Sequence, residues 1–405
     1  MTTRNAALRK FAFSAILLAF PFNPAAAQDA SAVAERLKAL SAKQGVELAW
    51  TNVTGDASNM VIEGLTAKPA GEAEAFALGN VTLSGVVEED GGFRVDTTTT
   101  EPISTTTEGV TVELSEIVVR GLNIPAEGSD DPLAAITFYD SIEMASAAFT
   151  MAGKEVFSIN GLSGEISQPT EDRPMDFTAA IANFSGDLSG IADPQTRAWV
   201  DAFGFQTING SYQASGTWNM ADGRLNITQN EITVEDAGTF GVRVDIGGYT
   251  LDFIKQMQDM QKRMAAQPAG EAANPGTEME MLALMQKLSL NGAAIRFDDA
   301  SLTNKIIDFV ASQQGQKRED IVNLAKAGLP FALMQLQLPD LAAAIAPAVN
   351  TFLDDPRSIE IKAAPPTPVP FTLLGGAAMA NPNDPGAAAK ALWSMLGVTV
   401  TANQP

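Results

Sequence analysis

The sequence predicts an α+β protein: a long, curved, groove-like antiparallel β-sheet with an inserted helical hairpin and a mostly helical C-terminal region. Three patterns predict this class. Polar and apolar residues alternate with period two through most of residues 46–124 and 205–247, which is typical of half-buried strands. Residues 251–290 change to helical spacing. From residue 301 onward, most apolar residues recur at the intervals of amphipathic helices.

The N-terminus has the three parts of a secretory signal peptide. Arg4, Arg9 and Lys10 form a positive region, residues 11–20 are apolar, and residues 25–27 are three alanines, as at a signal peptidase site. The apolar run is too short to cross a bilayer. We therefore expect residues 1–27 to be removed, the mature chain to have no transmembrane segment, and the protein to be exported to the periplasm of a Gram-negative bacterium.

Residues 28–250 form the predicted antiparallel β-rich region. Apolar residues repeat at helical spacing in residues 31–44, so a short amphipathic helix precedes the first strand. Strand-like segments follow, and the turn residues of Glu88–Gly92 favour a hairpin. Residues 193–204 interrupt the strands as a predicted helix, with Asp193 as its N-cap.

Residues 251–290 form the predicted helical hairpin, which is rich in methionine. Its tip, residues 265–276, consists mostly of alanine, proline and glycine, and we expect it to be mobile. In the first helix one apolar stripe consists of Phe253, Met257, Met260 and Met264. In the second helix the apolar set is Met281, Leu282, Met285 and Leu288, with Leu284 beside it.

Residues 291–405 form the predicted helical C-terminal region, which closes with a strand. The segment 288–297 first returns to strand, and later strand patterns occupy 358–363 and 398–403. A proline-rich segment, residues 364–372, is predicted to be extended. Helices are predicted at residues 302–314, 318–328, 338–355 and 384–397.

Composition excludes several kinds of chemistry. The chain has no histidine and no cysteine, which removes Ser-His-Asp and Cys-His catalysis, His-ligated zinc and iron–sulfur clusters. Its net charge of −22 argues against a nucleic-acid partner. We therefore expect no enzyme activity, no cofactor and no metal site. One alternative is kept: Asp298 and Asp299 are either caps of the following helix, with Arg296 as an ion-pair partner, or a carboxylate pair for glycan hydrolysis.

The methionines have two interpretations. They are either core residues of helices that close the sheet, or a lip over an apolar groove, because methionine adapts to varied apolar partners. The second interpretation supplies the candidate ligand-binding residues, Phe253, Met257, Met260, Met264, Met281 and Met285. An acyl chain needs no polar chemistry in such a groove, since each buried CH₂ contributes roughly 0.8 kcal/mol.

Three segments resemble bacterial periplasmic AsmA-like and YdgA-like envelope proteins. They are VELAWTNVTGDASNMVIEGL, GTWNMADGRLNITQNEITVEDAG and LSLNGAAIRFDDASLTNKIIDFVASQQG. The resemblance implies a β-groove and a role in lipid homeostasis or transfer in the envelope. Members of that family usually keep an N-terminal membrane anchor, whereas this sequence predicts a cleaved signal peptide.

These observations leave three functional hypotheses. The first is a non-catalytic periplasmic protein that binds lipid or another apolar ligand in a β-groove as part of envelope homeostasis. The second is a structural or interaction protein of the envelope, with an envelope protein as partner and no small ligand. The third is the carboxylate-dependent glycan hydrolase.

Overall fold

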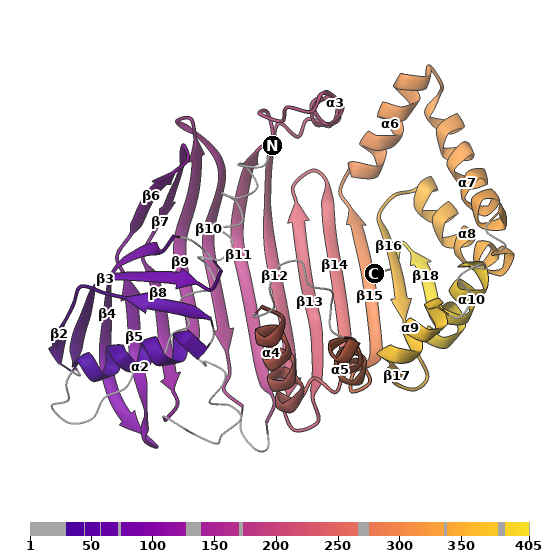
Figure 1. Cartoon of the computed structure of the whole chain (residues 1–405). Helices are drawn as coiled ribbons and strands as arrows, with labels where there is room; N and C mark the ends of the chain where they lie inside the picture. Colours follow the sequence, from indigo (N-terminus) through magenta and orange to yellow (C-terminus); the bar gives the residue numbers. More distant parts are fainter. Residues whose placement is uncertain are drawn as a thin grey trace. The chain divides into compact units, whose positions relative to one another are not determined.

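The computed structural model describes residues 30–43, 45–56, 58–71, 74–126, 139–169, 173–265, 275–335, 338–379 and 385–404. The predicted signal peptide, residues 1–27, and most of the predicted tip, residues 265–276, lie outside these residues. Within them the fold is α+β, with antiparallel strands and helices inserted between them (Figure 1). The sequence predicts this coarse class.

The chain divides into two compact units. Unit 1 contains residues 1–168 and 176–187, and unit 2 contains residues 169–175 and 188–405. The division falls inside the segment 28–250, which the sequence analysis treats as one β-rich region. Each unit is described by itself because each has hydrophobic clusters of its own.

Unit 1 begins with a helix and continues with antiparallel strands. Many strand residues are valine, isoleucine or threonine, whose branched side chains suit a pleated surface. Its elements are α2 (Ala30–Lys43), β1 (Val46–Ala49), β2 (Asn52–Asp56), β3 (Asn59–Pro69), β4 (Phe76–Glu89), β5 (Gly92–Thr100), β6 (Ile103–Thr107), β7 (Val110–Leu114), β8 (Ile117–Ile124), β9 (Ser141–Met151), β10 (Lys154–Ile166) and β11 (Met175–Asp187).

The strands of unit 1 form an antiparallel meander. β3 pairs with β4, β4 with β5, β5 with β8, β8 with β9, β9 with β10 and β10 with β11. β6 and β7 form a hairpin whose second strand also pairs with β9. β1 and β2 both pair with β3. The predicted hairpin at Glu88–Gly92 is confirmed, because Asp90 (φ 52°) and Gly91 (φ 70°) form the turn between β4 and β5.

Helix α2, which the sequence predicts, packs on the first strands of unit 1. Its residues Val33 and Leu37 are 1% exposed and share one cluster with Met60, Ile62 and Leu83, which are 0% exposed. Burial of a side chain of this size contributes about 1.5–3 kcal/mol. These strands therefore pack solidly against their helix.

Unit 2 alternates strands and helices. Its elements are α3 (Pro194–Phe203), β12 (Thr207–Asn219), β13 (Arg224–Val234), β14 (Gly238–Gly247), α4 (Leu251–Ala265), α5 (Pro275–Met285), β15 (Ser289–Asp299), α6 (Leu302–Gln314), α7 (Arg318–Gln335), α8 (Pro339–Asp354), β16 (Ser358–Ala363), β17 (Val369–Pro370), α9 (Phe371–Met379), α10 (Pro385–Leu396) and β18 (Val398–Ala402).

The sheet of unit 2 is antiparallel throughout its long strands. β12, β13, β14, β15, β16 and β18 are successive neighbours (Figure 1). The short β17 pairs with the first residues of β15. The predicted closing strand is confirmed, because β18 pairs with β16 from Val398 to Ala402. Helices α4 and α5 are inserted between β14 and β15, and helices α6 to α8 between β15 and β16.

Helix α3 confirms the capping prediction. The Asp193 carboxylate accepts a hydrogen bond from the backbone N–H of Thr196 at 2.8 Å, and Gly204 ends the helix in the left-handed conformation (φ 74°). The hydrogen bonds that Thr196 donates from its backbone N–H and its hydroxyl lower the pKa of the Asp193 carboxyl below its ordinary value. Trp199 and Phe203 of α3 contact Phe309 of α6, with ring centroids 5.2 and 5.6 Å apart.

Two predictions in the C-terminal region are wrong in detail. The helix predicted at residues 318–328 continues to Gln335 through Pro330, because α7 packs along α8 and is joined to it by the Lys326–Asp354 ion pair. The proline-rich segment 364–372 is not extended throughout, since α9 begins at Phe371. In both places tertiary packing decides where the helix begins or ends.

Candidate functional site

The structure brings the methionine candidates of α4 and α5 together. Phe253 is 3% exposed and Met260 is 1% exposed, and both belong to a cluster with Leu284 and Leu288. Met257, Met281 and Met285 are partly buried against that cluster. Met264 lies in α4, and its side chain is outside the described part of the structure. The buried members of the set therefore pack against one another.

The apolar face of α5 differs from the predicted one. Leu284 is 4% exposed, whereas Leu282, which the sequence analysis places in the stripe, is 54% exposed. Met281, Leu284, Met285 and Leu288 follow the regular spacing of one helical face, and Leu282 lies outside it. Met279, also on α5, is 73% exposed. The α4–α5 pair thus has a packed interior and an apolar exterior on α5.

Ion pairs join α4 to α5 at both ends. Arg263 contacts Glu280 with Nη2 and Oε2 2.6 Å apart, and Lys287 contacts Asp252 with Nζ and Oδ2 2.9 Å apart. The hydrogen bond from Lys287 is the main cause that lowers the pKa of the Asp252 carboxyl. Both pairs are solvent-exposed, so they orient the helices and contribute little free energy.

One face of the unit 2 sheet is apolar, and we call it the apolar face. Strand residues alternate between the two faces of a sheet, and residues paired in register lie on the same face. One registered row on this face consists of Tyr212, Ile232, Phe240, Phe297 and Ile359. A second row consists of Val242, Ile295, Ile361 and Val400.

The middle of the apolar face is exposed. Ile232 is 42% exposed, Phe240 46%, Ile295 47% and Ile361 49%. These residues come from the four adjacent strands β13, β14, β15 and β16. A contiguous exposed apolar patch of this kind marks a binding surface for a protein, a membrane or an apolar ligand.

Helices cover the ends of the apolar face. Phe352 of α8 packs with Phe297, Ile359 and Val400. Trp218 of β12 contacts Tyr249, which precedes α4; the indole N–H donates to the Tyr249 carbonyl at 2.8 Å, and Tyr249 packs in turn on the α4–α5 cluster. The exposed middle is therefore bordered by packed elements.

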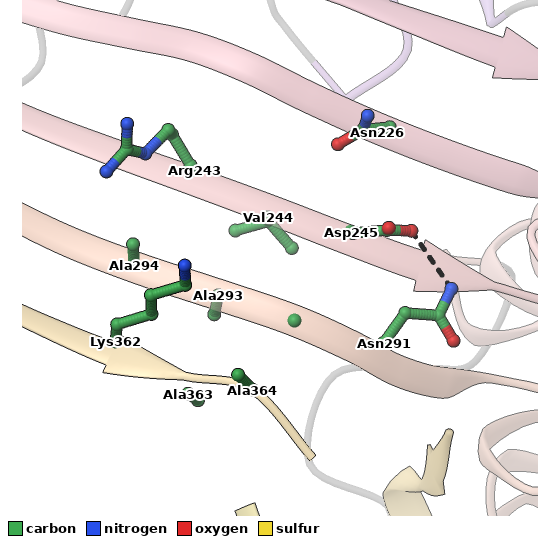
Figure 2. Close-up of a pocket in the computed structure, with 11 residues that line it drawn as sticks. Asn226, Arg243, Val244, Asp245, Asn291, Ala293, Ala294, Lys362, Ala363 and Ala364 are labelled. Carbon is green, nitrogen blue, oxygen red and sulfur yellow. Dashed lines mark hydrogen bonds between the residues drawn. The ribbon is translucent and has the colours of Figure 1, made fainter. Parts of the chain in front are cut away.

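The opposite face of the unit 2 sheet is polar and contains a pocket of about 400 Å³, which we call the polar pocket. Its lining residues are Asn226, Arg243, Val244, Asp245, Asn291, Gly292, Ala293, Ala294, Lys362, Ala363 and Ala364. Figure 2 shows the side chain of Asn291 hydrogen-bonded to Asp245, with Arg243 and Lys362 farther along their strands. The pocket is shallow and open to solvent.

The two candidate carboxylates have structural roles. Asp299 accepts a hydrogen bond from the backbone N–H of Thr303 at 2.8 Å and so caps α6. Arg296 binds Asp298 through Nε and Nη2, which raises the pKa of the guanidinium. This arrangement favours the capping and ion-pair interpretation over a hydrolytic carboxylate pair.

The ion pair beside the polar pocket makes stability depend on pH. Asp245 accepts hydrogen bonds from Arg224, at 3.1 and 2.6 Å, and from Asn291, at 2.9 Å. The Arg224 hydrogen bonds are the main cause that lowers the pKa of Asp245 below 3.8. Because the folded pKa lies below the unfolded one, the stabilisation is fully present above the unfolded pKa, about 3.9, and is lost as pH falls through the folded pKa.

We predict that Asp245→Asn lowers the melting temperature by a constant amount between about pH 5 and 8, and that the gap to wild type narrows progressively as the pH falls below about 4. Thermal unfolding followed by circular dichroism at several pH values measures this gap. Glu235→Gln is the control, because the side chain of Glu235 lies in an exposed turn and has no hydrogen bond or ion pair among the described residues. A gap that does not narrow between about pH 5 and pH 2 would contradict the assignment.

Neither a metal centre nor a membrane-spanning helix is found among the residues that the structure describes. No group of three or more Asp or Glu side chains there is placed to hold a metal ion. No described helix is both long and apolar enough to cross a bilayer.

Comparison with known proteins adds one finding. A protein-family model described only as an uncharacterized protein matches residues 231–403. No curated protein matches the chain. The matched residues contain α4, α5, most of the apolar face and most of the polar pocket.

Proposed function

We propose that the protein is a non-catalytic, exported periplasmic protein that binds a lipid or another apolar ligand in a groove on the apolar face of unit 2. The observation that carries this proposal is the set of exposed apolar side chains in two neighbouring rows across four adjacent strands, 42–49% exposed. Water-exposed apolar area of this extent is stabilised when a hydrocarbon covers it.

The energetics favour an acyl chain or a similar hydrocarbon. Each CH₂ group that moves from water onto an apolar surface contributes roughly 0.8 kcal/mol, so a chain of about ten carbons offsets the cost of association without a polar anchor. This chemistry requires neither histidine nor cysteine, and the chain has neither.

The α4–α5 pair is the proposed border of this groove. Met281 and Met285 are partly buried, while Met279 and Leu282 are exposed. Unbranched methionine side chains adapt to ligands of different shape. In this proposal the buried Phe253 and Met260 position the pair, and the exposed residues of α5 form the lip.

The proposed cellular role follows from the N-terminal sequence and from the family resemblance. The signal-peptide pattern of residues 1–27 predicts export. The resemblance to AsmA-like and YdgA-like envelope proteins implies a role in lipid homeostasis or transfer. Both remain predictions, and together they make an envelope lipid the preferred ligand class.

A direct test uses protein exported to the periplasm and purified without detergent. Native mass spectrometry should show a fraction of the protein at a mass increased by one lipid, and organic extraction should release that lipid. Incubation with phosphatidylethanolamine vesicles should increase this fraction. Protein that carries no lipid and takes none from the vesicles contradicts the proposal.

A second candidate function is a structural or interaction protein of the envelope. The observation that favours it is an exposed apolar surface on α7, where Leu324, Phe331 and Met334 are 59%, 57% and 54% exposed. Replacing Phe331 by glutamate distinguishes the two: in an interaction protein it changes complex formation and leaves lipid content unchanged.

A further inference from the structure

The polar pocket places two cationic side chains on either side of a small residue. Arg243 of β14 pairs in register with Ala294 of β15, and Ala294 pairs with Lys362 of β16. All three therefore share the polar face, and the Cα atoms of the two cations lie about 10 Å apart. Ala294 is 7% exposed, so it forms a low floor between two long side chains.

The anionic groups of the pocket are already bound. Asp245 accepts three hydrogen bonds from Arg224 and Asn291. Glu360 forms an ion pair with Arg243 and is 16% exposed, whereas the Arg243 side chain is 49% exposed. The carboxylates therefore have little acceptor capacity left for a ligand.

The hydrogen-bond donors of the pocket are in excess. Within the described residues, Lys362 Nζ has no ion-pair or hydrogen-bond partner, and the Asn226 amide likewise has none. Arg243 keeps N–H groups beyond the one that binds Glu360. A ligand that accepts hydrogen bonds and carries negative charge fits these free donors.

We propose that the polar pocket binds a phosphate group between Lys362 and Arg243. Arginine and lysine are the residues that proteins use for phosphate, arginine through its planar fork and lysine as a point charge. The alanine and glycine floor leaves room for the tetrahedral oxyanion. The phosphate belongs either to a free ion or to a lipid headgroup.

The site is separate from the apolar face, because it lies on the other side of the same sheet. A phosphate here does not require the proposed lipid groove, and the groove does not require this phosphate. Since the net charge of the whole chain is −22, the long-range field repels anions, and local pairing must overcome it. Binding should therefore depend on contact geometry, and salt should weaken the long-range repulsion by screening it.

Isothermal titration calorimetry with inorganic phosphate, in a buffer whose salt screens the long-range repulsion, tests this proposal. We expect saturable binding to the wild-type protein and a dissociation constant that is about tenfold higher for Lys362→Gln, because one charge-assisted hydrogen bond is lost. Lys317→Gln is the matched control: it removes the same charge from an exposed turn of unit 2 and should leave the dissociation constant unchanged.

Two further measurements distinguish a lipid headgroup from a free phosphate ion and separate this site from the apolar face. Co-sedimentation with vesicles that contain phosphatidic acid should depend on Lys362 when the site takes a lipid headgroup, and titration by phosphate alone supports the free ion. No heat with phosphate, or equal affinities of the Lys362→Gln and Lys317→Gln proteins, would overturn the proposal. Displacement of a fluorescent fatty acid, which carries no phosphate, should be the same in both variants, which separates this test from that of the apolar face.

Discussion

Replacing Ile295 by glutamate is expected to reduce lipid binding by at least tenfold while the protein remains folded. Ile295 lies in the middle of the apolar face, between Val242 and Ile361, and is 47% exposed. A carboxylate there would be desolvated by a bound hydrocarbon, and an unpaired polar group costs several kcal/mol when it is covered. In the free protein the carboxylate remains in water, so the free energy of unfolding should change by less than about 1 kcal/mol.

The measurement is the fraction of protein with a lipid adduct in native mass spectra, together with displacement of a fluorescent fatty acid. Val87→Glu is the matched control, because Val87 is another β-branched strand residue, 59% exposed, in unit 1. Its variant has the same charge and should bind lipid like wild type. Equal loss in both variants would mean that charge, and not the apolar face, determines binding.

Replacing Met260 by alanine should cause a large loss of stability in the α4–α5 pair. Met260 is 1% exposed in the cluster with Phe253 and Leu284. Truncation of a buried methionine leaves a cavity and costs about 2–5 kcal/mol. Hydrogen exchange of residues 251–265 and 275–288, measured by mass spectrometry, should accelerate accordingly.

Met279→Ala is the control for this prediction. Met279 belongs to the same pair of helices and is 73% exposed, so its truncation should change stability by no more than about 0.5 kcal/mol. Under the proposed function, Met279→Ala weakens lipid binding more than it affects folding. If Met260→Ala left exchange rates unchanged while lowering lipid binding, Met260 would be a ligand contact and not a core residue.

Local patterns predicted most elements of the fold. The N-cap Asp193, the hairpin turn at Glu88–Gly92 and the closing strand β18 all follow from short-range chemistry that is visible in the sequence. The prediction was wrong where long-range packing decides: α7 continues through Pro330 beside α8. The division of the β-rich region into two units likewise depends on which strands pair with each other. The alternation of polar and apolar residues within one strand does not reveal its partner strand.

The candidate site was only partly accessible to sequence reasoning. The spacing of Phe253, Met257 and Met260 predicts a shared helical face, and the structure groups these residues in one cluster. The sequence pattern does not predict that Ile295 and Ile361 are exposed, because an apolar residue in an alternating strand is normally expected to face a core. More strands have an apolar face than the helices can cover. This excess indicates an exposed apolar face, but it can be recognised only once the pairing of the strands is known.

The ion pair between Arg243 and Glu360 has a consequence for how the protein reaches its fold. The two residues are separated by 117 positions, and β14, β15 and β16 must assemble around the inserted helices before the pair can form. Contacts of such high sequence separation close slowly. We therefore expect unit 2 to be the late-folding half of the chain. During that delay its apolar strands are open to proteases and to self-association, so a chaperone that shields newly made chains should raise the yield of this protein more than that of a locally connected helical one.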